Sequence, residues 1–133
     1  MRATTEGQRA LFVRRRRRDG EAGITQRLDE LSRLTEGWLD GEGIPPDASV
    51  VDRARAVLRD LRKFDVPRPR VYATPEGGMQ AEWTVESSEV SVTFEPDGSL
   101  YAISVNDHSG QIDELELAVN RPEQIAEFVI RAS

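Results

Sequence analysis

Two of the residue types that most often carry out catalysis or hold a metal are scarce or absent in this chain. The 133 residues include no cysteine and a single histidine, His108. Thiol catalysis, disulfides and cysteine-based zinc or iron–sulfur sites are therefore excluded, and one chain cannot supply a multi-histidine metal site. His108 lies between Asp107 and Ser109, but the members of a catalytic triad normally converge from separate elements. We therefore expect no triad at this position.

Two sets of carboxylates could take part in other chemistry. Asp40, Glu42 and Asp47 lie in one stretch rich in Gly and Pro, and their oxygens could bind a divalent cation, although the spacing does not fit an EF-hand. Glu82, beside Trp83, could act as a general acid or base if it lined a cleft. Solvated carboxylates are the favoured interpretation of both sets. We predict no catalytic residue, metal or cofactor; a hydrolase that uses Glu82, or Asp40 with Glu42, is the less favoured alternative.

The charged residues are unevenly distributed along the chain. Residues 1–20 contain seven arginines against Glu6 and Asp19, a net charge of +5, whereas residues 21–133 contain 11 basic and 22 acidic side chains, a net charge of −11. An acidic body favours a cationic partner surface. Five arginines are consecutive: Arg14, Arg15, Arg16, Arg17 and Arg18. Such a run could bind nucleic acid by releasing counterions, but no aromatic residue interleaves with it and no nucleic-acid-binding motif surrounds it.

The chain is long enough for one domain, preceded by a basic arm. Residues 1–23 have polar ends and little hydrophobic periodicity, which predicts a flexible segment. Within it, Leu11, Phe12 and Val13 could anchor a short strand or a docking peptide. Residues 24–133 are predicted to form a single α+β domain. No apolar run is longer than the four residues 10–13, which is far too short to cross a bilayer, and no signal peptide is evident, so we expect a cytoplasmic protein.

Three helices are predicted from hydrophobic spacing and capping residues. The first spans residues 24–38, where apolar side chains recur every three or four residues: Ile24, Leu28, Leu31, Leu34 and Trp38. The second spans about residues 48–63, capped by Asp47 or by Ser49, which has capping-box spacing to Asp52. The third follows Asn120 as its cap, with Pro122 in the first position.

Between the second and third helices, alternating residues predict strands in residues 70–105. Met79, Ala81 and Trp83 share one strand face, with Gln80, Glu82 and Thr84 on the other. In the next two strands the shared faces are Val90, Val92 and Phe94, then Tyr101, Ile103 and Val105. Residues 112–119 are ambiguous. We expect an α+β fold with two N-terminal helices, a four- to five-stranded antiparallel meander with one buried face, and one C-terminal helix.

Part of the chain, roughly residues 34–105, resembles a loose group of small uncharacterised bacterial proteins. Their shared pattern is a Gly-Trp-x-x-Gly-x-Gly loop, here residues 37–43, then a helix and a Thr-Pro-x-Gly-Gly-x-Gln-x-Glu-Trp hairpin, here residues 74–83, followed by the Pro-Asp-Gly turn of residues 96–98. The resemblance implies a companion of a larger gene product, as in toxin–antitoxin, immunity or phage-defence loci. It carries no assigned activity, and the arginine run is not part of the pattern.

These observations favour a non-enzymatic accessory module that binds a larger protein, encoded at the same locus. The residues expected to contact that partner are Leu11, Phe12, Val13, Trp38, Asp40 and Glu42. Trp38 could serve as an aromatic anchor at the end of a loop. Nucleic-acid binding through residues 14–18 is the alternative. An open sheet edge would also permit a homodimer, whereas membrane association is not expected.

Overall fold

The computed structural model describes residues 21–118 and 121–132, which form an α+β fold. The elements, in chain order, are α2 (Glu21–Ser32), α3 (Ala48–Leu61), β1 (Arg70–Ala73), β2 (Met79–Val85), β3 (Ser88–Phe94), β4 (Leu100–Asn106), β5 (Ile112–Leu117) and α4 (Pro122–Arg131). The predicted fold class is confirmed, including a fifth strand within the ambiguous segment. Because α2 begins at Glu21, residues 21–23 are helical and do not belong to the arm to which the sequence assigned them.

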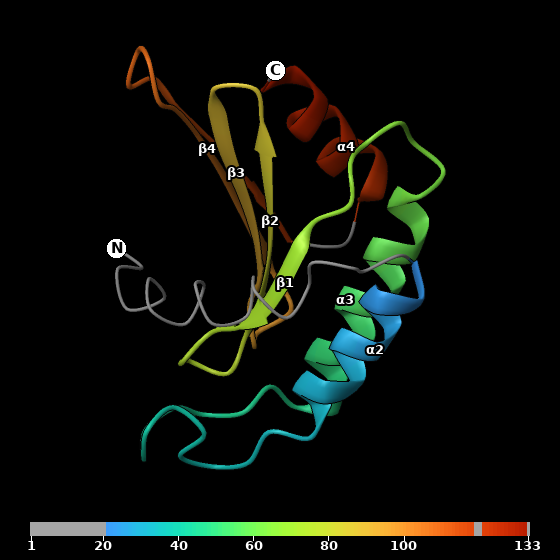
Figure 1. Cartoon of the computed structure of the whole chain (residues 1–133), viewed down its shortest axis with the longest axis vertical. Helices are drawn as coiled ribbons and strands as arrows, with labels where there is room; N and C mark the ends of the chain where they lie inside the picture. The colour runs from blue at the N-terminus through green and yellow to red at the C-terminus, as the bar shows by residue number, and fades with distance from the viewer. Residues whose placement is uncertain (1–20, 119–120, 133) are drawn as a thin grey trace.

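The five strands form one antiparallel sheet in the order β1-β2-β3-β4-β5. Each strand pairs with the next along the chain, as a meander requires, so β1 and β5 are the two edges. The helices pack against one face of this sheet, which gives the molecule two layers (Figure 1). The core lies between the layers. Its largest fully buried side chains include Trp83, Phe94, Leu28, Leu31 and Met79.

The hairpin between β3 and β4 decides which side chains of β4 enter the core. Its loop has three residues, 96–98, closed by a hydrogen bond of 2.9 Å from the Glu95 N–H to the Ser99 carbonyl. Leu100 therefore pairs with Phe94 on the core face. Tyr101, Ile103 and Val105 do share a face, as predicted, but it is the face away from the helices. A two-residue loop would have shifted the register by one and reversed the two faces.

The prediction of a single buried face is wrong. On the side of the sheet opposite the helices, four side chains are also buried: Tyr72, Gln80, Glu82 and Thr93. They are adjacent across strands β1, β2 and β3, because Tyr72 pairs with Gln80 and Gln80 with Thr93. Glu82 is only 5% exposed, so the expectation that it faces solvent is also wrong.

The first predicted helix ends earlier than the hydrophobic spacing suggested. Helix α2 stops at Ser32, and the N–H groups of Arg33 and Leu34 donate to carbonyls three residues back, which tightens the last turn. Leu34 and Trp38 continue the helical spacing but lie beyond the helix, where both pack against the core. The Gly37 N–H is instead bonded to the Gly43 carbonyl, and this closes a loop. The tertiary contacts of that loop thus override the helical pattern.

The structure confirms Asp47 as the cap of α3 but differs from the expected capping box and from the expected cap of α4. Asp47 caps α3 by accepting from the Val50 N–H at 3.1 Å, and the Ser49 hydroxyl donates to the same carboxylate at 2.7 Å. The Ser49 hydroxyl is therefore already bonded to the Asp47 carboxylate. Ser49 lies inside the helix and does not form the capping box expected with Asp52. The same helix ends at Leu61, two residues before the predicted end. Helix α4 has Arg121 as its N-cap residue, without a side-chain capping bond, in place of the predicted Asn120.

Candidate functional site

The Gly-Trp-x-x-Gly-x-Gly segment folds into a small hairpin of its own. Leu39 and Glu42 exchange two backbone hydrogen bonds of 2.7 and 2.9 Å, so Asp40 and Gly41 form the tip. The half-buried Trp38 donates its indole N–H to the Ile44 carbonyl at 3.1 Å. A Cβ atom on Gly43 would lie only 3.0 Å from the indole nitrogen, which explains why a glycine follows the hairpin. Trp38 thus supports the loop from within.

This hairpin is joined to the turn between β1 and β2, thirty residues further along the chain. The Ile44 N–H donates to the Pro75 carbonyl at 2.8 Å, and Ile44 forms an isolated parallel bridge with Glu76. Thr74 closes the turn, because its hydroxyl accepts from the Gly78 N–H at 3.0 Å. A Cβ atom at Gly78 would lie 2.6 Å from the Phe94 carbonyl oxygen, so only glycine fits there. The Gly-Trp-x-x-Gly-x-Gly loop and the β1–β2 turn therefore form one structural unit.

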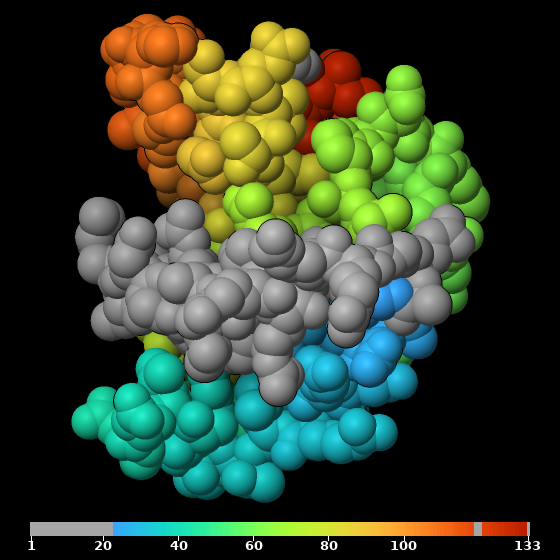
Figure 2. All heavy atoms as spheres, in the orientation of Figure 1, coloured from blue at the N-terminus to red at the C-terminus, as the bar shows by residue number. Residues whose placement is uncertain are grey.

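We name the exposed residues of this unit the loop platform: Asp40, Glu42, Ile44 and Glu76. Ile44 is 54% exposed, and the three acidic residues are also exposed. Figure 1 shows the loop and the β1–β2 turn at the same end of the molecule. In the space-filling view, the loop projects as a lobe at that end (Figure 2). The platform presents one apolar side chain among three carboxylates.

Two further carboxylates belong to the same loop end. The Ser49 hydroxyl and the Val50 N–H lower the pKa of Asp47, and the Ser99 N–H and hydroxyl lower the pKa of Asp97. Each hydrogen bond stabilises the ionised form. Asp47 precedes α3 and Asp97 lies in the β3–β4 loop, so both add negative charge near the platform at neutral pH.

The predicted contact residues differ from one another in their exposure to solvent. Asp40 and Glu42 lie exposed on the loop platform, whereas Trp38 is half-buried beneath it. The remaining predicted contacts, residues 11–13 and the arginines 14–18, lie outside the described residues. Ile44 was not singled out from the sequence. The signal was an isolated isoleucine between Gly43 and two prolines, in a segment with no other reason to retain a large apolar side chain.

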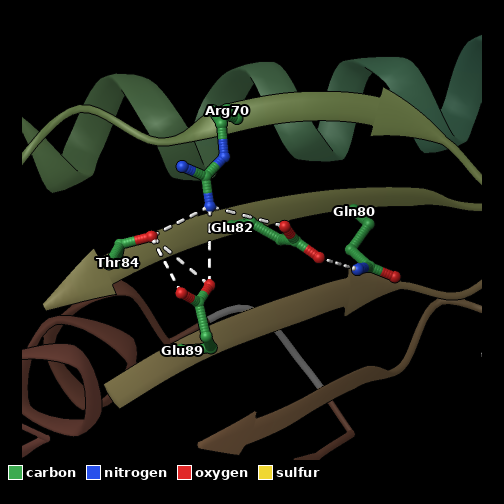
Figure 3. A network of polar contacts seen from close by, with 5 residues as sticks. All are labelled: Arg70, Gln80, Glu82, Thr84 and Glu89. Carbon is green, nitrogen blue, oxygen red and sulfur yellow. Dashed lines mark hydrogen bonds and ion pairs between the residues drawn. The ribbon is translucent and has the colours of Figure 1, made fainter. Parts of the chain in front are cut away.

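A second polar cluster lies on the sheet face opposite the helices (Figure 3). The Arg70 guanidinium approaches Glu82 and Glu89 at 3.6 Å each and donates to the Thr84 hydroxyl at 3.1 Å. The Gln80 amide donates to the other oxygen of Glu82 at 2.9 Å. The strand register causes this arrangement, because Arg70 and Glu82 pair directly across β1 and β2. Glu82 is thus oriented by an amide and a cation within the sheet.

The remaining candidates for chemistry do not assemble into a site. The Asn106 side chain accepts from the backbone N–H groups of His108 and Ser109 at 2.9 Å each, which forms the exposed turn between β4 and β5. Across residues 21–118 and 121–132, no three Asp, Glu or His side chains gather closely enough to hold a metal ion. Asp40, Glu42 and Asp47 therefore do not form the cation site considered from the sequence.

The comparisons with known proteins provide no template for the site, so we interpret the site from its own geometry. No family model, no curated protein and no solved structure matches this chain. Within the part of the chain that the structure describes, no helix combines the length and apolar character needed to span a bilayer. The strongest local feature is the loop platform, because it combines an exposed apolar residue, fixed backbone geometry and concentrated charge.

Proposed function

We propose that this protein is a non-enzymatic accessory module that binds a larger protein through the loop platform. The observation that carries the proposal is Ile44, a large apolar side chain that is 54% exposed while its backbone is fixed to Pro75. A lone exposed isoleucine needs no explanation by itself. Here it belongs to a loop unit with a fixed backbone, whose exposed residues also include three carboxylates.

The composition of the platform defines the partner surface that would fit it. Apolar contacts near the centre of an interface contribute most of the affinity, whereas charges at the rim steer the approach and select the partner. Ile44 would enter a shallow apolar pocket. Asp40, Glu42 and Glu76 would then face lysine or arginine side chains around that pocket. A basic partner surface also complements the net charge of −11 on residues 21–133.

The hydrogen bonds of the loop reduce the entropy lost on binding. The Leu39–Glu42 pair, the Gly37–Gly43 bond and the Ile44–Pro75 bond fix the backbone before any partner arrives. A surface that is already in its bound conformation does not lose loop entropy on association. We therefore expect binding without a large rearrangement of the platform.

The biological setting of this proposal comes from the resemblance of residues 34–105 to small bacterial proteins. Companions of larger gene products in toxin–antitoxin, immunity or phage-defence loci are the setting that it implies. We propose a cytoplasmic protein whose partner is encoded at the same locus. No catalytic role is assigned to Glu82, because the hydrogen bond from Gln80 and the Arg70 cation orient it within the sheet.

The test is affinity capture of the tagged chain from its native host, with quantitative mass spectrometry. Ile44→Ser is compared with Ile112→Ser, because the two isoleucines are equally exposed at 54% and Ile112 lies on β5. Asp40→Asn with Glu42→Gln is compared with Asp113→Asn with Glu114→Gln, again on β5. We expect a stoichiometric protein with the parent chain, lost in both platform variants and retained in both β5 variants.

Two results would contradict this proposal. One is a captured protein that all four variants retain, since the platform would then make no contact. The other is a predominance of nuclease-sensitive material that is lost when Arg14 to Arg18 are changed to alanine. That outcome would support the alternative function, a nucleic-acid-binding component that acts through the arginine run.

A further inference from the structure

A cavity of about 460 Å³ opens between α2, α3 and the segment that leads into β1. Its volume lies within the range of small-molecule sites. Four lining side chains also belong to the core: Leu28, Leu58, Leu61 and Trp83. Val66 and the partly exposed Phe64 also line it. The cavity is distinct from the loop platform, because its α3 residues lie at the opposite end of that helix from Asp47.

Trp83 lines this cavity without leaving a polar group unmet, and its side chain is only 2% exposed. Its indole N–H donates to the Pro67 carbonyl at 2.7 Å. The only polar atom of the side chain is therefore satisfied, and what remains of the indole is apolar. The Trp83–Pro67 bond also holds the connecting segment in place as one wall of the cavity.

The polar side chains that line the cavity are predominantly cationic. Four arginines contribute to the lining: Arg55, Arg59, Arg62 and Arg68. Arg55 forms an ion pair with Asp29 at 3.1 Å, and Arg59, which is 66% exposed, forms a longer one with Asp60 at 3.7 Å. Among the described residues that line the cavity, none is acidic. This concentration of positive charge is unusual in a body with 22 acidic residues against 11 basic ones.

We propose that this cavity binds a small anionic amphiphile, specifically the carboxylate of a medium-length alkyl chain. The chain would lie against the accessible parts of Ile24, Phe64 and Val66, because Leu58 and Trp83 are only 5% and 2% exposed. The carboxylate would remain at the arginine rim, where guanidinium groups offer charge-assisted hydrogen bonds. An apolar lining with a few cationic groups at its mouth is the complement of such a molecule. This assignment does not depend on the proposed protein-binding function.

Decanoate, below its micelle concentration, is the probe for isothermal titration calorimetry on the full chain. We expect saturable binding at one site per chain. Decyltrimethylammonium and decanol, which have the same chain length with a positive or no charge, should bind at least tenfold more weakly. In two-dimensional NMR, decanoate should shift the indole N–H signal of Trp83 and leave that of Trp38 unchanged.

A matched pair of variants locates the anion. Arg59→Gln with Arg62→Gln should weaken decanoate binding at least fivefold. Arg33→Gln with Arg131→Gln, which removes two exposed arginines elsewhere, should leave it within twofold. The Thr25→Trp variant, which places a large ring at an exposed lining position, should compete with the alkyl chain for the cavity. Circular dichroism and thermal unfolding of every variant confirm that each is folded.

Three results would overturn the proposal. They are the absence of saturable decanoate binding to the folded chain, equal binding of the cationic and neutral probes, and shifts at Trp38 without shifts at Trp83. Binding that survives in the Arg59 and Arg62 variant would also exclude the arginine rim as the anion site. The loop-platform variants are not involved in any of these measurements, so the two proposals can fail separately.

Discussion

The ionisation of the Asp47 carboxylate makes the stability of the start of α3 depend on pH. The Ser49 hydroxyl and the Val50 N–H lower its pKa below the ordinary value of 3.8. A carboxylate whose pKa is lower in the folded state contributes stability above its unfolded pKa, and that contribution is lost as the pH falls through the folded value. Asp47→Ala should therefore destabilise the protein at pH 7. The difference from the parent chain should shrink as the pH is lowered below 3.8.

Urea unfolding of the parent chain, Asp47→Ala and Asp47→Asn between pH 2 and 7 measures this effect. Asparagine caps helices about as well as aspartate but does not titrate. The gap between the Asn and Ala variants should consequently be independent of pH. A parent-to-Ala gap that stayed constant down to pH 2 would show that the ionised carboxylate is not the stabilising form.

Arg70 balances the charges of two carboxylates on the sheet. Arg70→Met would leave the buried Glu82 and the partly exposed Glu89 without the cation that lies 3.6 Å from each. We expect a loss of about 2 kcal/mol in the free energy of unfolding. This is less than the 3–5 kcal/mol typical of a fully buried pair, because Glu89 is 39% exposed.

A double-mutant cycle separates the charge effect from lost packing. Arg70→Met combined with Glu82→Gln should be less destabilised than the sum of the two single variants, since the carboxylate charge that Arg70 faces is then absent. Chemical denaturation of the four proteins provides the comparison. Strict additivity would mean that Arg70 and Glu82 do not interact energetically.

At the scale of the element, substitutions in strand β4 test the register that the β3–β4 hairpin imposes. Leu100 faces the helices and is buried, whereas Ile103 is half-buried on the other face. Leu100→Ala should cost roughly 2–5 kcal/mol, as for other buried leucines. Ile103→Ala should cost about 1 kcal/mol, because it removes less area from the interior. Thermal and urea unfolding measure both values, and the reverse ranking would indicate a register shifted by one residue.

The helices show how far local sequence patterns predict an element. Helix α3 was predicted well because an amphipathic stripe and its cap Asp47 agree with each other. The range predicted for helix α2 was too long at its C-terminal end, because Leu34 and Trp38 continue the apolar stripe after the backbone has left the helix. Those two residues pack against the same core from a loop. An apolar residue can be buried from a helix or from a loop, so its burial alone does not predict which of the two it belongs to.

At the scale of the whole molecule, the described residues contain a hydrophobic core that joins the helices to the sheet. Within residues 21–118 and 121–132, the buried members of this core run from Leu28 to Val129. A chain comprising residues 21–133 retains this described core, and we predict that it unfolds cooperatively, with a melting temperature within about 5 °C of the full chain, which corresponds to about 1 kcal/mol. Its net charge changes from −6 to −11.

Calorimetry and far-UV circular dichroism of both chains measure this prediction. A second truncation, which ends at residue 121 and lacks α4, serves as the comparison. It removes four buried residues, Ile125, Ala126, Phe128 and Val129, and should abolish cooperative unfolding. If removal of residues 1–20 had the same effect, those residues would belong to the folding unit.

The sequence by itself determined the α+β class, the meander order and the polarity of the chain, because these depend on local periodicity, turn residues and charge. Tertiary structure decided the rest. The three-residue loop before Ser99 set the faces of β4, and cross-strand pairing buried Glu82 beside Arg70. The bond between Ile44 and Pro75 joined two loops thirty residues apart and formed the platform. Contacts between residues so distant in sequence leave no periodic signal, so only the folded chain reveals them.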